Sequence, residues 1–195
     1  MSAGFLSVLS QAQRYVTERV QVGEPVVDAT TGNGVDTLFL AKQTGSGGLV
    51  FAFDVQAEAL ERTRVRLENA ASAGERLARV ELLLAGHEEM STRVPSDYHG
   101  RIAAIMFNLG YLPGADQKLT TQPDTTLIAL TSALMLLRGG GALTIVVYPG
   151  HEGGDAEAAA VEQWASTIPP TIAQCVAYRF PQKKASPYLI AIVKK

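Results

Sequence analysis

Residues 28–42, with the sequence DATTGNGVDTLFLAK, decide the fold class of this chain. They follow a short apolar run that ends at Val27, and they carry two glycines, Gly32 and Gly34. The residues after Gly34 have the apolar spacing of a helix. The pattern therefore predicts a strand, a tight turn and a helix, with Asp28 at the end of the strand. Because glycine allows close backbone approach and a helix N-terminus favours an anion, we expect a ligand with an anionic end here.

Strand-like and helix-like segments alternate along the rest of the chain. Expected strands cover residues 26–27, 49–54, 79–85, 101–107, 142–148, 173–180 and 188–193, and expected helices cover residues 3–19, 35–44, 57–73, 124–137 and 155–168. Asp124 or Thr125 is the expected N-cap of the helix over 124–137, and the glycines 139–141 are expected to end it. Alternation of this kind, with nearly continuous apolar strands, indicates a parallel sheet covered on both faces.

The last two expected strands break this alternation. The connection 181–187 has no room for a helix, so these two strands should pair antiparallel. The prediction is an α/β, Rossmann-like fold. Its doubly wound, mostly parallel seven-stranded sheet has one antiparallel strand and lies in a single domain over residues 1–195.

Composition narrows the class of protein. Hydrophobic residues make up 47% of the chain and charged residues 18%, which favours a sizeable core. The single cysteine, Cys175, excludes a disulfide framework and a cysteine-based zinc site, and the three histidines lack ligand spacing, so we predict no metal. We find no bilayer-length apolar run and no signal-peptide pattern, and we expect a cytoplasmic protein with no membrane partner. With a net charge of −2, any surface for RNA must be local.

A second acid supports a nucleoside-containing ligand. Asp54 ends the second expected strand about 20 residues after the glycines, where an acid commonly binds a ribose diol. The third glycine of the dinucleotide fingerprint is absent, since Thr37 occupies its place, and no tyrosine has a lysine four residues later. Both facts weigh against a nicotinamide-dependent oxidoreductase, which stays an alternative. In the simplest alternative, the glycines only shape a turn and Asp54 caps a helix.

The predicted sheet and the pattern Asp28-x-x-x-Gly32-x-Gly34, followed by Asp54, resemble class I methyltransferases. This resemblance implies S-adenosylmethionine as the cofactor. It places the methionine end at the glycine turn and Asp28, the ribose at Asp54, and the adenine after the third strand. The implied cofactor-binding residues are Asp28, Thr30, Gly32, Asn33, Gly34, Asp36, Thr37, Asp54, Gln56, Gly86, His87 and Asn108.

A second motif, FNLGYLPG over residues 107–114, follows the fourth expected strand. Asn108-Leu109-Gly110-Tyr111 is similar to the Asn/Asp-Pro-Pro-Tyr motif of enzymes that methylate amino groups, with two prolines replaced. A neutral amine must be aimed at the sulfonium methyl, and the Asn108 oxygen with a nearby backbone carbonyl can accept its hydrogens. We assign the catalytic roles to Asn108, Leu109 and Tyr111, with Tyr111 able to stack on a base. The alternative is an ordinary strand-ending turn.

A third motif, VYPGHEGG, covers residues 147–154 and should overlook the same pocket. In it, His151 is either a substrate contact or a surface loop residue. The three motifs together resemble the small bacterial family labelled as rRNA methylases, over about residues 5–195. Members of that family have been assigned to methylation of the aminomethyl group on the wobble uridine of tRNA. The resemblance implies N-methylation of 5-aminomethyl-2-thiouridine in the anticodon region. Alternatives are an rRNA or small-molecule amine substrate, and a non-catalytic binding module.

Basic residues near the end of the chain suggest where RNA would bind. If the strand over 173–180 runs in the same direction as the parallel strands, the segment 179–187 leaves the sheet at the cofactor edge. The expected substrate contacts are Tyr111, Pro113, Lys118, Tyr148, His151, Arg179, Lys183 and Lys184. In the alternative, these charges are only solvated, as we expect for the arginines of the helix over 57–73. A homodimer is a further expectation.

Overall fold

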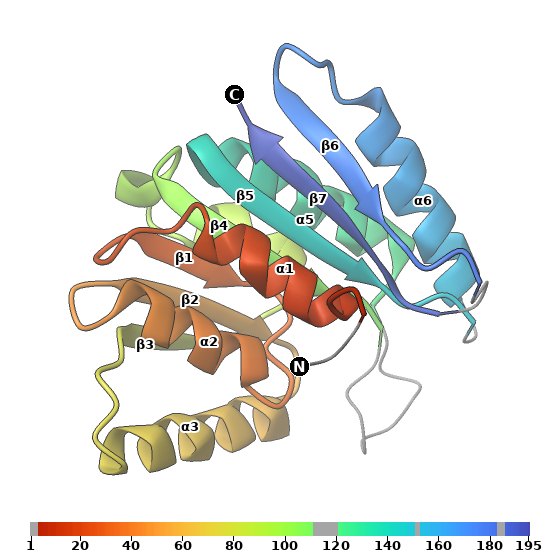
Figure 1. Cartoon of the computed structure of the whole chain (residues 1–195). Coiled ribbons are helices and arrows are strands. Elements are labelled where there is room, and N and C mark those ends of the chain that lie inside the picture. The colour runs from red at the N-terminus through yellow and green to blue at the C-terminus, as the bar shows by residue number, and fades with distance from the viewer. Residues whose placement is uncertain (1–3, 111–120, 151–152, 183–185) are drawn as a thin grey trace.

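The computed structural model describes residues 4–110, 121–150, 153–182 and 186–195 (Figure 1). Seven strands form one sheet in the order β3-β2-β1-β4-β5-β7-β6. Their bounds are β1 Pro25–Asp28, β2 Leu49–Asp54, β3 Arg79–Leu84, β4 Ile102–Asn108, β5 Leu137–Val147, β6 Ala173–Tyr178 and β7 Tyr188–Lys194. Only β7 runs antiparallel to its neighbours in this sheet, and every other pair is parallel. The predicted fold class is confirmed.

Helices cover both faces of the sheet. Their bounds are α1 Val8–Thr17, α2 Val35–Thr44, α3 Ala57–Ser72, α4 Met90–Arg93, α5 Pro123–Leu136 and α6 Gly154–Thr167. Figure 1 shows α1 and α2 in front of the sheet and α5 behind it. Successive strand residues point to opposite faces. Val26 and Val50 therefore join the core under α1 and α2, whereas Val27 and Phe51 join the core under α5 and α6.

Some helix and strand ends differ from the prediction. The first helix begins at Val8 rather than residue 3, because the Ser7 hydroxyl caps it by accepting from the Ser10 N–H at 3.1 Å. Gln122 is the N-cap of α5, since Pro123 takes the first helical position that suits it. The helix ends at Leu136, and Gly139 to Gly141 lie inside β5, where the pairing with β4 is irregular.

Residues 87–98 form two short 3-10 turns, η1 His87–Glu89 and η2 Ser96–Tyr98, around the single turn of α4. The sequence did not predict them, because segments of three or four residues are too short to show a helical period. Among the described residues, no helix has the length and apolar character needed to cross a membrane.

Parallel pairing brings the carboxyl ends of β1, β2, β4 and β5 to one edge of the sheet. The strand order reverses around β1 and β4, which is where open α/β sheets bind their ligands. Asp28, Asp54 and Asn108 each end a strand at this edge.

Candidate functional site

A cavity of about 950 Å³ opens at this edge. Its wall comes from the turn after β1, from the segments after β2, β3, β4 and β5, and from the start of α1. The structure brings most of the predicted residues to this wall, namely Thr30, Gly32, Asn33, Asp36, Asp54, Gln56, Gly86, His87, Asn108, Leu109 and Tyr148. Six other predicted residues lie outside the described part of the chain: Tyr111, Pro113, Lys118, His151, Lys183 and Lys184.

The glycine turn is fixed by hydrogen bonds to β2. The Thr31 N–H donates to the Phe53 carbonyl at 2.9 Å, and the Gly32 N–H donates to Asp54 Oδ2 at 2.8 Å. Gly34 has φ +74°, and a Cβ there would lie 2.6 Å from the Thr63 hydroxyl of α3. The absence of a side chain at this position therefore lets α3 pack directly on the turn.

Two arginines of α3 also hold this turn. Arg62 donates to Asn33 Oδ1 at 3.2 Å, and Arg66 donates to the Asn33 carbonyl at 2.7 Å. Arg62 and Arg64 also pair with acids of the same helix, Glu58 and Glu61. The contacts of Arg62 and Arg66 with Asn33 were not predicted, because a helical spacing does not reveal which loop a surface side chain reaches.

Asp28 supports the turn from behind. Its carboxylate is fully buried and accepts from Thr37 Oγ1 at 2.6 Å and from the Thr30 N–H at 3.2 Å. Burial, with a contribution from the charge of Asp36, raises the pKa of Asp28 to about 7. Asp28, Gly34 and Thr37 do not line the cavity, so the structure gives them an indirect part in the site.

Asp54 faces the cavity with both carboxylate oxygens held. Oδ2 accepts from Gly32 and Oδ1 accepts from the Gln56 N–H at 2.9 Å. A carboxylate has about four acceptor sites, so two backbone donors leave room for the hydroxyls of a ribose.

His87 forms part of the wall beyond β3. Its ring packs at a tilt against Phe107, with 5.7 Å between the ring centroids. Burial lowers the pKa of His87, which keeps the ring neutral at neutral pH. Its Nε2 atom is buried without a hydrogen-bond partner among the described residues.

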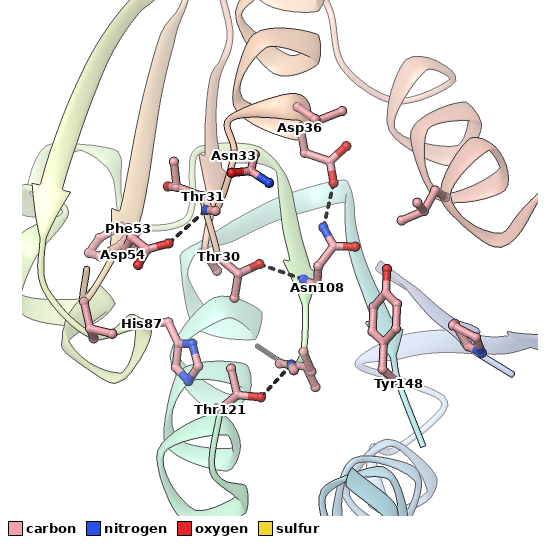
Figure 2. Close-up of a pocket in the computed structure, with 18 of the residues that line it drawn as sticks. Thr30, Thr31, Asn33, Asp36, Phe53, Asp54, His87, Asn108, Thr121 and Tyr148 are labelled. Carbon is pink, nitrogen blue, oxygen red and sulfur yellow. Dashed lines mark hydrogen bonds between the residues drawn. The ribbon is translucent and has the colours of Figure 1, made fainter. Parts of the chain in front are cut away.

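Asn108 lies at the centre of a polar network (Figure 2). Its backbone N–H donates to Thr30 Oγ1 at 2.7 Å, and its side-chain Nδ2 donates to Asp36 Oδ2 at 2.6 Å. The other oxygen of Asp36 accepts from Gln13 Nε2 of α1 at 2.8 Å. Asn108 Oδ1 is left buried without a partner in the described structure, on the side of Tyr148.

A buried acid that the sequence did not single out anchors the chain after β4. Gly110 and Thr121 are joined twice: the Gly110 N–H donates to Thr121 Oγ1 at 2.9 Å, and the Thr121 N–H donates to the Gly110 carbonyl at 3.0 Å. The Thr121 hydroxyl donates in turn to Glu157 of α6 at 2.6 Å, and Thr126 donates to the same carboxylate at 2.7 Å. Glu157 is 2% exposed, although the sequence around it resembles any solvent-facing helix turn.

The edge predicted to meet RNA carries paired charges. Because β5 and β6 both pair antiparallel with β7, β6 runs in the same direction as the parallel strands, and Pro187, just before β7, lines the cavity. Arg179 lies outside the cavity wall, where it pairs with Glu162 at 2.6 Å and covers the Tyr188 ring at 4.7 Å. Tyr148 lines the cavity, and its burial, together with the charge of Asp36, raises its pKa.

The charge of the cavity wall is one-sided. Its described residues include Asp36, Asp54 and Glu88 but no lysine or arginine. A concave wall of one sign concentrates ligands of the other sign, so this cavity favours a cationic ligand. No group of three metal-ligating side chains occurs in the described ranges.

The sequence also matches a known family. The model of the family described as "Putative rRNA methylase" matches residues 50–194. The chain belongs to this family.

This member of the rRNA methylase family also resembles a curated plant enzyme. The chain is 38% identical over 181 residues to the chloroplastic tRNA (mnm(5)s(2)U34)-methyltransferase of Arabidopsis thaliana; the match covers 90% of this chain. It spans 65% of the length of that relative.

Two solved structures match nearly the whole chain. One is a "putative rRNA-methylase" from Clostridium thermocellum, with 35% identity, a TM-score of 0.91, and coverage of 98% of this chain and 100% of the other. The second is SMU.1697c, a "putative methyltransferase" from Streptococcus mutans in complex with SAH, with 33% identity, a TM-score of 0.84 and the same coverage.

Proposed function

We propose that this protein is an S-adenosylmethionine-dependent methyltransferase that N-methylates the 5-aminomethyl group of the wobble (2-thio)uridine in tRNA. The observation that carries the proposal concerns Asn108, a residue of the acidic cavity wall, whose buried carbonyl oxygen has no hydrogen-bond partner among the described residues. An amine nucleophile needs such an acceptor, and the activity named for the Arabidopsis relative is of the same kind.

The residues of the cavity fit S-adenosylmethionine. Thr31 Oγ1, His87 Nε2 and Asn108 Oδ1 are buried polar atoms without partners in the described structure, and all three residues line the cavity. The cofactor carries a sulfonium and an ammonium, which suit the acidic wall, and its carboxylate suits the free N–H groups at the start of α2. Asp54 would hold the ribose, while Gly86 and His87 would border the adenine. When bound, the cofactor supplies an electrophilic methyl group on sulfur.

The protein itself would contribute position rather than acid–base chemistry. Asn108 Oδ1 accepts a hydrogen of the substrate amine and so aims the nitrogen lone pair along the cavity. Leu109, which is buried and tied to the Val146 carbonyl at 2.9 Å, keeps the neighbouring backbone in place and excludes water. Alignment of this kind is worth several powers of ten in rate.

The same wall weighs against a dinucleotide. A nicotinamide dinucleotide would bring two negative phosphates against Asp36, Asp54 and Glu88 without a described lysine or arginine to offset them. The description of the family favours one second candidate within the same reaction class, which is methylation of rRNA.

Nucleoside mass spectrometry tests the proposal directly. Purified protein is incubated with labelled cofactor and, separately, with rRNA and with tRNA from cells that lack the endogenous methyltransferase. We expect a 5-aminomethyl-2-thiouridine signal to gain one methyl group in tRNA only, and Asn108→Ala to abolish the gain. Label in rRNA would favour the second candidate, and label in neither pool would refute the proposal.

The proposal includes the partners and the compartment. RNA contacts would come from Tyr148, Arg179 and the undescribed Tyr111, Pro113, Lys118, His151, Lys183 and Lys184, next to the anticodon. The exposed Phe5 supports a homodimer, for which sedimentation velocity is the test. A single free cysteine, Cys175, supports the reducing cytoplasm, which localisation of the tagged protein would test.

A further inference from the structure

Asn108 lines the cavity, and its amide can place either of two opposite ends on the side of Tyr148 (Figure 2). An oxygen there can accept a hydrogen from an amine that enters the cavity, whereas an amino group there would repel the amine hydrogens. A flip about the terminal bond exchanges the two ends with almost no change of shape. The proposed reaction therefore needs something that holds this amide in one orientation.

Asp36 meets that need. An ionised carboxylate can only accept hydrogen bonds, so at 2.6 Å from Asp36 Oδ2 the Asn108 amide must present its Nδ2. Figure 2 shows the result: the amino end of Asn108 points to Asp36 and the carbonyl oxygen lies on the other side, toward Tyr148. That oxygen has no partner among the described residues.

Asp36 is itself held from a second direction. Gln13 Nε2 donates to Asp36 Oδ1 at 2.8 Å, so each carboxylate oxygen receives one amide donor, from α1 and from β4. Asp36 is 8% exposed and lies in the first turn of α2, where the positive end of the helix favours a negative charge. Gln13, although far from the sequence motifs, thus ties α1 to the site.

We propose that Asp36, fixed by Gln13, is a positioning residue that orients the Asn108 amide so that Oδ1 accepts the substrate amine. This inference rests on the proposed N-methylation. Two other titratable groups lie near Asp36, the Asp28 carboxyl and the Tyr148 phenol. The negative charge of Asp36 contributes to raising the pKa of both. In the proposed reaction Asp36 thereby acts through Asn108.

A set of four variants tests the direction of the hydrogen bond. In Asn108→Asp two carboxylates meet and must share a proton, so kcat should fall about 10- to 100-fold as the pH rises and that proton leaves. Asp36→Asn puts an amide that can either donate or accept opposite Asn108, so the Asn108 amide is no longer held in one orientation and kcat should fall by up to about 10-fold. The double variant Asp36→Asn with Asn108→Asp restores one donor and one acceptor in reversed order. We expect it to recover most of the lost kcat and to lose the added pH dependence.

Asp36→Leu and an exposed control complete the kinetic test. Asp36→Leu removes the acceptor, so kcat at saturating S-adenosylmethionine should fall about 10- to 100-fold, whatever the change in affinity for S-adenosylhomocysteine. Asp97→Leu, on the exposed η2 turn, should change neither quantity. If the double variant is no more active than Asn108→Asp, or if its pH profile matches that of the single variant, Asp36 does not orient Asn108.

An NMR measurement separates this inference from the proposed function, because it needs no substrate. In the wild type, one side-chain NH proton of Asn108 should resonate downfield and resist exchange with solvent, and in Asp36→Leu it should lose both properties. An unmoved Asn108 side-chain signal in Asp36→Leu would overturn the inference even if the enzyme methylates tRNA. The moved signal together with an enzyme inactive on every RNA pool would instead refute the proposed function.

Discussion

At the scale of single residues, Asp28 and Asp54 show how two aspartates in neighbouring strands come to differ. Asp28 is sealed behind the turn, where its carboxylate meets one hydroxyl and one backbone N–H. Asp54 stands on the cavity wall with two backbone donors and an open side. Burial therefore dominates the properties of Asp28. The properties of Asp54 come from its hydrogen bonds, which leave acceptor sites open toward the cavity.

The raised pKa of Asp28 makes stability depend on pH. Because the folded pKa of about 7 exceeds the ordinary value of 3.8, the folded state holds a proton that the unfolded state has lost. The free energy of unfolding should fall as pH rises from about 4 to about 7, by up to about 1.4 kcal/mol per pH unit. In Asp28→Asn this part of the pH dependence should vanish. Urea unfolding at several pH values measures it, with exposed Asp97→Asn as control, and equal slopes in wild type and Asp28→Asn would contradict it.

Asp54 leads to a prediction about binding. Hydrogen bonds to a charged group contribute about 1.5–3 kcal/mol, so Asp54→Ala should weaken S-adenosylhomocysteine binding by about 10- to 100-fold. Calorimetry on the folded variant measures this, and Asp97→Ala is the matched control. Unchanged affinity in a variant with a normal melting temperature would remove Asp54 from the cofactor site.

At the scale of elements, the turn that joins β1 to α2 depends on the contact of Gly34 with α3. Gly34 and Gly74 both have positive φ, at +74° and +88°. An added Cβ at Gly34 would meet the side chain and the Cα of Thr63 within 3 Å, whereas at Gly74 it would meet nothing within 4 Å. Alanine substitutions at the two glycines therefore distinguish the cost of backbone strain, which both share, from the cost of steric overlap, which only Gly34 has.

The corresponding variants should differ in stability. Gly74→Ala should cost about 1 kcal/mol for the left-handed backbone alone. Gly34→Ala should cost about 1–3 kcal/mol more, because α3 must move away from the turn. Chemical denaturation measures both, and cofactor affinity should fall only in Gly34→Ala. Equal losses of stability in the two variants would contradict this prediction, because they would mean that α3 can move away from the turn without lowering the free energy of unfolding.

The elements that sequence could predict are those whose cause is local. The β1–α2 turn was predictable because Gly32 and Gly34 indicate backbone conformations that other residues rarely adopt. The end of β2 at Asp54 followed from the length of its apolar run, whereas the fourth strand was predicted to end at Phe107, one residue before Asn108. The boundary between α5 and β5 was not predictable, because Gly139 to Gly141 suit both a helix end and an irregular strand. The roles of Gln13 and Glu157 depend on partners at least 23 residues away, at Asp36, Thr121 and Thr126, which no local pattern encodes.

At the scale of the whole molecule, charge indicates different binding places for the proposed cofactor and the proposed RNA. The chain carries a net charge of −2 and an acidic cavity, so the proposed RNA partner, a polyanion, would bind around the cavity rather than inside it. The base to be modified, with its amine, would then be the part of the RNA that enters.

Substitutions in the connection between β6 and β7 test whether RNA binds outside the cavity. Lys183→Glu combined with Lys184→Glu should weaken tRNA binding and reduce the slope of log affinity against log salt by about two. Cofactor affinity should stay unchanged. Lys42→Glu, at the far end of α2, is the matched control. Filter binding at several salt concentrations measures the slope, and an unchanged slope would place the RNA surface elsewhere.

The double link between Gly110 and Thr121 means that the chain leaves the cavity wall and rejoins it at one point. Because this pair of hydrogen bonds joins the two ends, an insertion or deletion in the sequence between Gly110 and Thr121 should leave the strands and the rest of the cavity wall as they are.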